Sequence, residues 1–211
     1  MNAVEQRAVR LTDSFAGFRV ATAFFLSGAA ALIYQVIWQR LLFVVVGVDI
    51  ESVTIVVSTF MMGLGVGAIL GGWLADIFPR RILLVFCLFE AGIAVFGLLS
   101  TDFILLLGRE FVGLSHASAA LLSFLCLLIP TMCMGATLPM LIANAFRRSD
   151  NIGISTGSLY FINTAGAALG ATLIGFILLY WLDIRESARL AACANLAASL
   201  IVATEMFTSR K

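Results

Sequence analysis

The sequence has few charged residues: Asp, Glu, Lys and Arg make up 12% of its 211 residues, about half the share found in soluble domains. Apolar residues make up 62%, and the mean hydropathy is +1.08. A soluble fold of this length could not bury that much apolar surface. The shortage of charge therefore excludes an ordinary water-soluble domain and a disordered chain, and the net charge of +1 argues against a nucleic-acid partner.

Cysteine and histidine are also scarce. Each of the four cysteines stands alone in an apolar stretch, and the single histidine is His116. Without a CxxC or Cys/His spacing, the cysteines are expected to pack as small apolar residues. Met132, Cys133 and Met134 carry sulfur that suits Cu(I), but a helix would point Met132 and Met134 in different directions. We therefore expect neither a metal ion nor another cofactor.

Long apolar stretches are what the sequence has instead, and each can cross about 30 Å of hydrocarbon. They cover approximately residues 18–39, 52–74, 82–100 (with a possible extension through 103–107), a part of 111–145, 157–181 and 188–207. We expect an all-α membrane protein with six transmembrane helices in residues 18–207, between an N-terminal segment, 1–17, and a C-terminal tail, 208–211. Pro130 predicts a kink in the fourth stretch, and Pro139 a second kink or a helix end. The alternative is that the excess length of this stretch forms an interfacial helix.

Lysine and arginine are divided unevenly between the two sides of this arrangement. Nine lie on the side of the N-terminus and four on the other side. Because the more basic side faces the cytoplasm, both termini are expected there, with the chain in the cell (inner) membrane. Trp38 and Trp181 are then expected near the outer interface and Trp73 near the inner one, as in an aromatic belt.

Glycine recurs at four-residue spacing in two of the six stretches. The second stretch and the fifth each present such glycines on one helix face, where a neighbouring backbone can come close. This spacing indicates tight helix packing, or the sliding contact of a transporter. The residues are Gly63, Gly67 and Gly71 in the second stretch, and Gly166 and Gly170 in the fifth.

A shift of 103 residues superimposes these two glycine patterns. It lays Gly63 on Gly166 and Gly67 on Gly170. The shift is about half of the chain, so it predicts two units of three helices each. Because three is an odd number, the two units would be inverted relative to each other in the membrane, as in many transporters.

The segment between the second and third stretches reads Gly-Trp-Leu-Ala-Asp-Ile-Phe-Pro-Arg-Arg, from Gly72 to Arg81. It resembles the signature loop of the major facilitator superfamily, G-x-L-A-D-R-x-G-R-R-x-x-L, with Asp76, Arg80 and Arg81 at matching positions. This resemblance implies a bundle like one half of a facilitator transporter. Asp76 could pair with an arginine or cap a helix, or the loop could simply be a basic cytoplasmic loop.

The run from Ser27 to Leu42, together with the segments Met134–Pro139 and Gly157–Gly166, resembles another group of proteins. It is similar to the membrane module of the membrane-embedded spermidine-synthase-like proteins, which join such a module to an aminopropyltransferase domain. The resemblance covers approximately residues 20–205. A Rossmann-like transferase needs alternating strands and helices and a glycine-rich turn, and residues 1–211 do not supply them. We therefore expect no aminopropyl transfer and no catalytic residue in this chain.

A few polar side chains interrupt the apolar stretches and form the candidate intramembrane site. Glu90 lies near the middle of the third stretch, where a carboxyl group is costly and often couples protons or cations; it could also be a neutral group bonded to a neighbouring helix. Tyr34 and Gln35, near the outer end of the first stretch, could line a cavity. Asn163, in the fifth, could bond between helices.

Three functions remain open from the sequence. The chain could be a membrane subunit that anchors or scaffolds a partner protein or complex, in keeping with the missing catalytic domain. It could instead be a facilitator-like transporter of a small solute, for example a cationic polyamine, working as a homodimer because facilitators use two six-helix halves. A membrane enzyme is the third option and lacks a recognisable catalytic constellation. The expected partners are the lipid bilayer and another protein subunit or a second copy.

Overall fold

The computed structural model describes residues 3–110, 115–146 and 152–208, and within these ranges the chain is helical throughout its regular structure. The elements are α1 (Ala3–Val46), α2 (Asp49–Ile77), α3 (Ile82–Glu110), α4 (His116–Phe146), α5 (Ile152–Leu173), η1 (Ile174–Leu178), α6 (Leu179–Trp181) and α7 (Ile184–Thr208). The predicted all-helical fold with six long apolar helices is confirmed.

Six segments of these helices are long and apolar enough to cross a membrane. They are Gly17–Val45, Ile50–Ile77, Ile82–Arg109, Ala117–Ala145, Thr156–Trp181 and Ile184–Met206. Each overlaps one predicted stretch, and several are longer than predicted. α3 continues through Ser100, Thr101 and Asp102, and the Ser100 hydroxyl donates a hydrogen bond of 2.8 Å to the Gly97 carbonyl within the helix.

Both prolines of the fourth stretch lie inside α4, which runs on to Phe146. The helix end considered near Pro139 is therefore wrong. Next to Pro130, the Thr131 hydroxyl lies 2.9 Å from the carbonyl oxygens of Leu127 and Leu128, to either of which it can donate. The carbonyl that Pro130 leaves without its usual donor is that of Cys126, four residues earlier, so these hydroxyl bonds lie beside the missing donor and do not replace it. The beginning of the fourth stretch, residues 111–114, lies outside the described residues.

The fifth apolar segment is not one regular helix. α5 passes into the π-helical turn η1 at Ile174, and the short α6 ends the segment at Trp181. A π turn accommodates an extra residue and rotates the following side chains around the axis. No feature of the apolar pattern predicted this turn.

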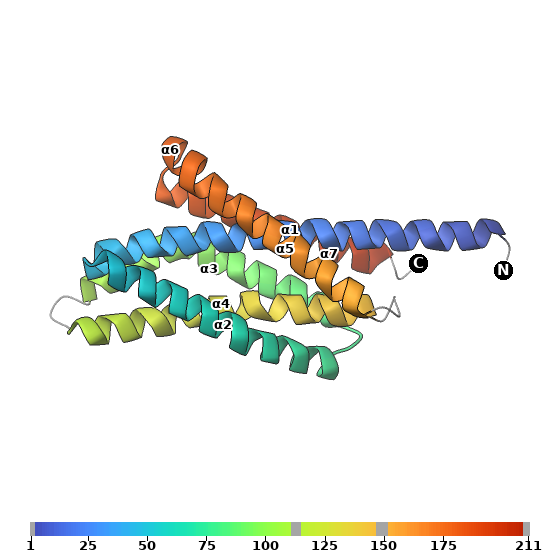
Figure 1. The fold of residues 1–211 in the computed structure, drawn as a ribbon, viewed down its shortest axis with the longest axis horizontal. Coiled ribbons are helices and arrows are strands. Elements are labelled where there is room, and N and C mark those ends of the chain that lie inside the picture. Colours follow the sequence, from blue (N-terminus) through green and yellow to red (C-terminus); the bar gives the residue numbers. More distant parts are fainter. Residues whose placement is uncertain (1–2, 111–114, 147–151, 209–211) are drawn as a thin grey trace.

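The helices form an elongated bundle with α1 at its centre (Figure 1). α1 packs against α2, α3, α4, α5 and α7, while α2 packs along α4 and α3 along α7. The start of α1 and the end of α7 lie at the same end of the bundle, with the α2–α3 connection; we call this the N-terminal end. The α1–α2 turn, α6 and the start of α7 lie at the opposite end, which we call the far end. The α1–α2 turn is made by Gly47, whose φ of 78° favours glycine.

The glycines of α2 and α5 lie where backbones approach most closely. A Cβ atom on Gly67 would collide with the Met132 carbonyl oxygen of α4, and one on Gly71 with the Ala136 carbonyl oxygen. On the other side of the bundle, a Cβ atom on Gly170 would collide with the Ala29 carbonyl oxygen of α1. Gly63 and Gly166 make similar close approaches to Thr131 and Phe25.

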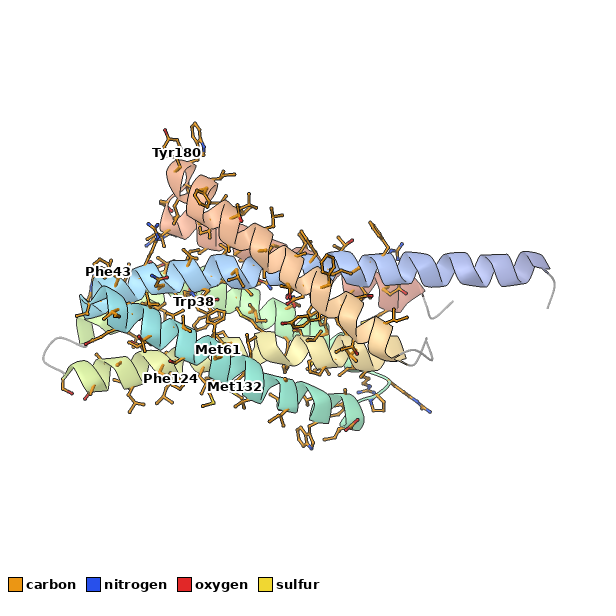
Figure 2. The ribbon with its side chains drawn as sticks, in the orientation of Figure 1. Trp38, Phe43, Met61, Phe124, Met132 and Tyr180 are labelled. Carbon is orange, nitrogen blue, oxygen red and sulfur yellow. The ribbon has the colours of Figure 1, made fainter. Side chains whose placement is uncertain are left out.

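Large apolar side chains are abundant on the outside of the bundle as well as in its core. Phe176 is 82% exposed and Trp181 is 77% exposed, and both belong to Thr156–Trp181, the least buried of the six long segments. Figure 2 shows Tyr180 pointing away from the bundle at the far end, whereas Trp38 lies inside it. Trp38 is fully buried, so its assignment to an aromatic belt is wrong.

Candidate functional site

Glu90 is fully buried in the interior of the bundle, where both of its carboxyl oxygens are hydrogen-bonded. The Ser27 hydroxyl of α1 donates to Oε1 and the Asn195 amide of α7 donates to Oε2, each over 2.6 Å. Within the described part of the chain no cation pairs with Glu90. The carboxyl group therefore joins three helices through two uncharged donors.

Small side chains bring these three helices together. Ala191, Asn195 and Ala198 are four and three residues apart on α7, so they share one face, and all are buried. On α1, Ser27 stands three residues before Ala30, which is fully buried. Small residues let helix backbones approach, which brings short polar side chains within hydrogen-bonding reach. The local sequence thus explains why Glu90 meets a serine and an asparagine.

A second polar contact joins α3 and α7 one turn from Glu90. The Ser199 hydroxyl donates to the Cys87 carbonyl over 3.0 Å, and the Cys87 thiol donates to the Ser199 carbonyl over 3.3 Å. Cys87 precedes Glu90 by three residues and Ser199 follows Asn195 by four, so the two contacts lie along one α3–α7 seam.

Tyr34 lies on the same face of α1 as Ser27, seven residues further toward the far end. It is fully buried, and its hydroxyl lies against Gly97 of α3, where a Cβ atom would collide with it. Its ring stacks on Trp38 with centroids 5.4 Å apart. Among the described residues, neither the Tyr34 hydroxyl nor the Trp38 indole nitrogen has a hydrogen-bond partner.

The other two residues of the candidate intramembrane site lie apart from this cluster. Asn163 of α5 donates a hydrogen bond of 3.1 Å to the Phe24 carbonyl of α1, at the α1–α5 contact. Gln35 is partly buried and lies about 100° around α1 from Tyr34. The structure therefore brings Tyr34 to the α1–α3 contact near Glu90 and leaves Gln35 and Asn163 elsewhere.

Ser27 and Asn195, the hydrogen-bond partners of Glu90, were not part of the intramembrane site predicted from the sequence. Each is an ordinary polar residue in an apolar helix, and the sequence contains several others of this kind. One signal was available: Ser27, Tyr34 and Trp38 are seven and four residues apart and must share a face of the first helix. What the sequence does not specify is that α3 and α7 present Glu90 and Asn195 to this face.

The connection between α2 and α3 carries the facilitator-like motif at the N-terminal end of the bundle. Asp76, Arg80 and Arg81 are exposed, and Gly72 has no neighbour within 4 Å of the place of a Cβ atom. Across the described residues, Asp76 makes no ion pair. Its expected pairing with an arginine is therefore not observed.

Two ion pairs connect helices near the ends of the bundle. Arg19 of α1 and Glu205 of α7 are 3.5 Å apart at the N-terminal end. Arg185 of α7 and Asp102 of α3 are 2.5 Å apart at the far end. Among the residues whose positions are given, no three His, Cys, Asp or Glu side chains gather into a possible metal site.

The fold and site of the described residues thus define a class of protein. It is an all-helical bundle of six long apolar helices, and a buried carboxyl group in its interior accepts hydrogen bonds from two uncharged side chains. The chain is 26% identical over 171 residues to a polyamine aminopropyltransferase of Oceanobacillus iheyensis. The match covers 81% of this chain and 32% of that protein, so the chain spans about a third of the length of the curated relative. No family model and no solved structure matches the chain.

Proposed function

We propose that the chain is a membrane-embedded module that holds a partner protein at the bilayer, and that this partner is an aminopropyltransferase-type enzyme. The similarity to a polyamine aminopropyltransferase carries the proposal, because it extends over most of this chain but only a third of that enzyme. Glu90 is sealed inside the bundle, where a nucleoside substrate cannot reach it. Catalysis is therefore assigned to the partner, on the same polypeptide or on a separate one.

A position across the cell membrane is supported by the distribution of apolar and charged side chains. Phe176, Ile69 and Trp181 are each at least 77% exposed, and lipid would cover them at no cost. Arg80 and Arg81 lie at the N-terminal end, which the uneven division of basic residues assigns to the cytoplasm. Both termini are then cytoplasmic.

An organisation in two inverted three-helix units is supported by the glycine contacts. Adding 103 to Gly67 gives Gly170, and adding 103 to Ala29 gives Met132. Gly67 packs on the Met132 carbonyl, and Gly170 packs on the Ala29 carbonyl. One shift thus relates both members of the α2–α4 contact to both members of the α5–α1 contact, as two related units would require. Inverted units of this kind are characteristic of facilitator-like bundles.

The partner is proposed to dock at the cytoplasmic end, where the α2–α3 connection is exposed. Arg80 and Arg81 are exposed there, and among the described residues neither takes part in an ion pair. Two free guanidinium groups next to the bilayer suit an acidic surface on a soluble partner.

Co-purification tests the proposal. The tagged chain is extracted with mild detergent from its own host, and the Arg80→Ala/Arg81→Ala double variant is compared with Arg109→Ala, which removes an exposed arginine at the far end of α3. For an enzyme on a separate polypeptide, we expect the double variant to lose the aminopropyltransferase and Arg109→Ala to retain it. If neither the parent chain nor any variant retains such an enzyme, the proposal is wrong.

A second candidate function is transport of a small solute, for example a cationic polyamine, by a homodimer. Glu90 favours it, since a buried carboxyl group inside a membrane bundle often serves ion coupling. Uptake of radiolabelled spermidine into vesicles containing the chain tests it. Transport predicts uptake that disappears with Glu90→Gln while the protein stays folded, and vesicles without any uptake exclude it for this solute.

A further inference from the structure

The buried polar groups without partners are distributed unevenly along the bundle. Six side-chain atoms in the described residues are buried and lack a hydrogen-bond partner: Tyr34 Oη, Trp38 Nε1, Thr101 Oγ1, Ser123 Oγ, Ser187 Oγ and Asn195 Oδ1. Asn195 lies beside Glu90, and the other five lie in the far half of their helices. Buried polar atoms of this kind are usually satisfied by internal water.

Glu90 lies where α1, α3 and α7 meet, and each of these three helices carries such a group between Glu90 and the far end. Along α1, Tyr34 lies about 10 Å beyond Ser27, and along α7, Ser187 lies about 12 Å beyond Asn195. Along α3, Thr101 lies about 16 Å beyond Glu90. Thr101 also lines a surface pocket of about 550 Å³ at the far end. The polar groups therefore extend from the buried carboxyl group to a surface pocket.

The opposite side of Glu90 is apolar and closed. Toward the N-terminal end, α1, α3 and α7 contribute Phe24, Phe86 and Val202 to one core cluster, and all three side chains are at most 1% exposed. The polar groups at this level, Cys87 and Ser199, are bonded to each other's carbonyl oxygens. Among the described residues, the buried side-chain atoms that lack a partner thus lie beside Glu90 or toward the far end from it, and none lies toward the N-terminal end.

We propose that Glu90 is a proton-binding site that exchanges with the far side of the membrane along this line of polar groups. The small size of the site favours a proton over any larger cation. Glu90 is fully buried and both oxygens are held at 2.6 Å by Ser27 and Asn195, which leaves no space for a metal ion or an organic ammonium group. A proton requires no added volume.

The proton exchange involves one O–H bond and no other reactant. When Glu90 loses its proton, the bond to Oε1 breaks, the electron pair stays on the carboxylate, and the proton passes to water on the far side. Ser27 then donates to Oε1, as observed. When Glu90 regains the proton, the serine hydroxyl rotates and accepts, since a hydroxyl group can do either. Asn195 donates to Oε2 in both states.

Among the described residues of α1, α3, α4 and α7, Glu90 is the carboxyl group that lies at middle depth in the bundle. The other titratable side chains at middle depth in α1, α3, α4 and α7 are a phenol and thiols: Tyr34, Cys87, Cys126, Cys133 and Cys193. The described charged side chains of these helices lie toward the bundle ends: Arg19, Arg40, Asp102, Arg109, Arg185, Glu186, Arg189 and Glu205. A proton change in the middle of the bundle is therefore assigned to Glu90.

Infrared spectroscopy of the full chain in phosphatidylcholine vesicles tests the site. We expect a carboxylic-acid C=O band that shifts in D2O, decreases as the pH rises, and is absent from Glu90→Gln. The matched control, Asp76→Asn, removes an exposed carboxyl group and should retain this band. Absence of a Glu90-dependent band, or a band that does not respond to pH while the protein stays folded, overturns the proposal.

The exchange rate of the same band tests the route. Thr101→Val and Tyr34→Phe each remove one polar atom of the line, so each is expected to slow the H/D exchange of the band about tenfold. Cys87→Ala, on the closed side, should leave the rate unchanged. Slower exchange in Cys87→Ala with normal rates in the other two would place access on the N-terminal side and contradict the proposal. The outcome is independent of partner binding, because the vesicles contain this chain alone.

Discussion

Glu90 and Glu205 are the buried carboxyl groups of the described residues, and the bundle satisfies them differently. Glu205 lies near the N-terminal end, where the long side chain of Arg19 can reach it from a partly exposed position. Glu90 lies in the middle, where a charged partner would have to be buried as well at considerable cost. Two short neutral donors, Ser27 and Asn195, take the place of an arginine there.

The hydrogen bonds to Glu90 should contribute modestly to the free energy of unfolding. Ser27→Ala removes one interhelical bond and is expected to cost about 0.6 kcal/mol. Glu90→Ala removes the acceptor of two buried donors and should cost about 1–3 kcal/mol or more. Thermal and chemical unfolding in detergent micelles measures both. Equal stability of Glu90→Ala and the parent chain would show that the cluster does not hold the helices together.

Glu90→Gln is expected to be nearly neutral for stability. The new amide still accepts from Ser27, and Asn195 can turn its own amide so that Oδ1, which lacks a partner, accepts the new N–H group. The same unfolding assay measures this variant beside Glu90→Ala. A loss as large as that of Glu90→Ala would mean that the negative charge itself stabilises the bundle.

The sequence could identify Glu90 at the residue scale because a lone acid in an apolar stretch is conspicuous. It could not identify Ser27 and Asn195 as its partners, because pairing depends on which helices become neighbours. The sequence left open whether Tyr34 lines a cavity, and it could not indicate that the Tyr34 ring stacks on Trp38. Such contacts follow from the rotation of each helix about its axis, which stretches that are apolar on all sides specify poorly.

At the scale of the elements, α2 and α5 each use glycine to approach a different neighbour. The spacing of Gly67 and Gly71 could predict a close contact, but not that its partner is α4. The π turn η1 was likewise beyond the pattern, since it depends on local hydrogen bonding that hydropathy does not report. The sequence left open whether the helix continues past Pro139 or ends there, and the structure shows that α4 continues to Phe146. The six helices were predictable because length and apolar content suffice for them.

The two glycine contacts should be equally sensitive to a single added carbon. Gly67→Ala and Gly170→Ala each place a Cβ atom against a backbone carbonyl oxygen, and we expect a loss of about 1–3 kcal/mol for each. Gly65→Ala and Gly175→Ala are matched controls, because no described atom beyond their own stretch of helix lies within 4 Å of their Cβ positions. Unfolding measurements in which the controls lose as much as the contact variants would contradict the packing described.

At the scale of the whole molecule, the number of apolar stretches predicts the helix order and the relative position of the two termini. It does not predict which helices are neighbours in the bundle. An even number of spans predicts termini on the same side, and the helix ends next to both termini lie at the same end of the bundle (Figure 1). Which helices touch could not be inferred from the sequence, because the 103-residue shift predicts two related units and does not name the neighbours of a helix. The placement of the bundle in the cell membrane remains a prediction.

Topology reporters test that placement. A reporter active only in the cytoplasm, fused after Lys211, should be active, and the same reporter inserted beside Asp183 should be inactive. A reporter active only outside the cytoplasm should give the reverse pattern. Activity of the cytoplasmic reporter at Asp183 would invert the orientation and move the exchange route of Glu90 to the cytoplasmic side.

The most direct test of the proposed function is the composition of the intact particle. The chain, tagged and gently extracted from its own host, is weighed by native mass spectrometry without dissociation. We predict a stoichiometric complex that contains an aminopropyltransferase-type unit, either on the same polypeptide or on a second polypeptide. A particle made of this six-helix chain alone, as one copy or two, would contradict it.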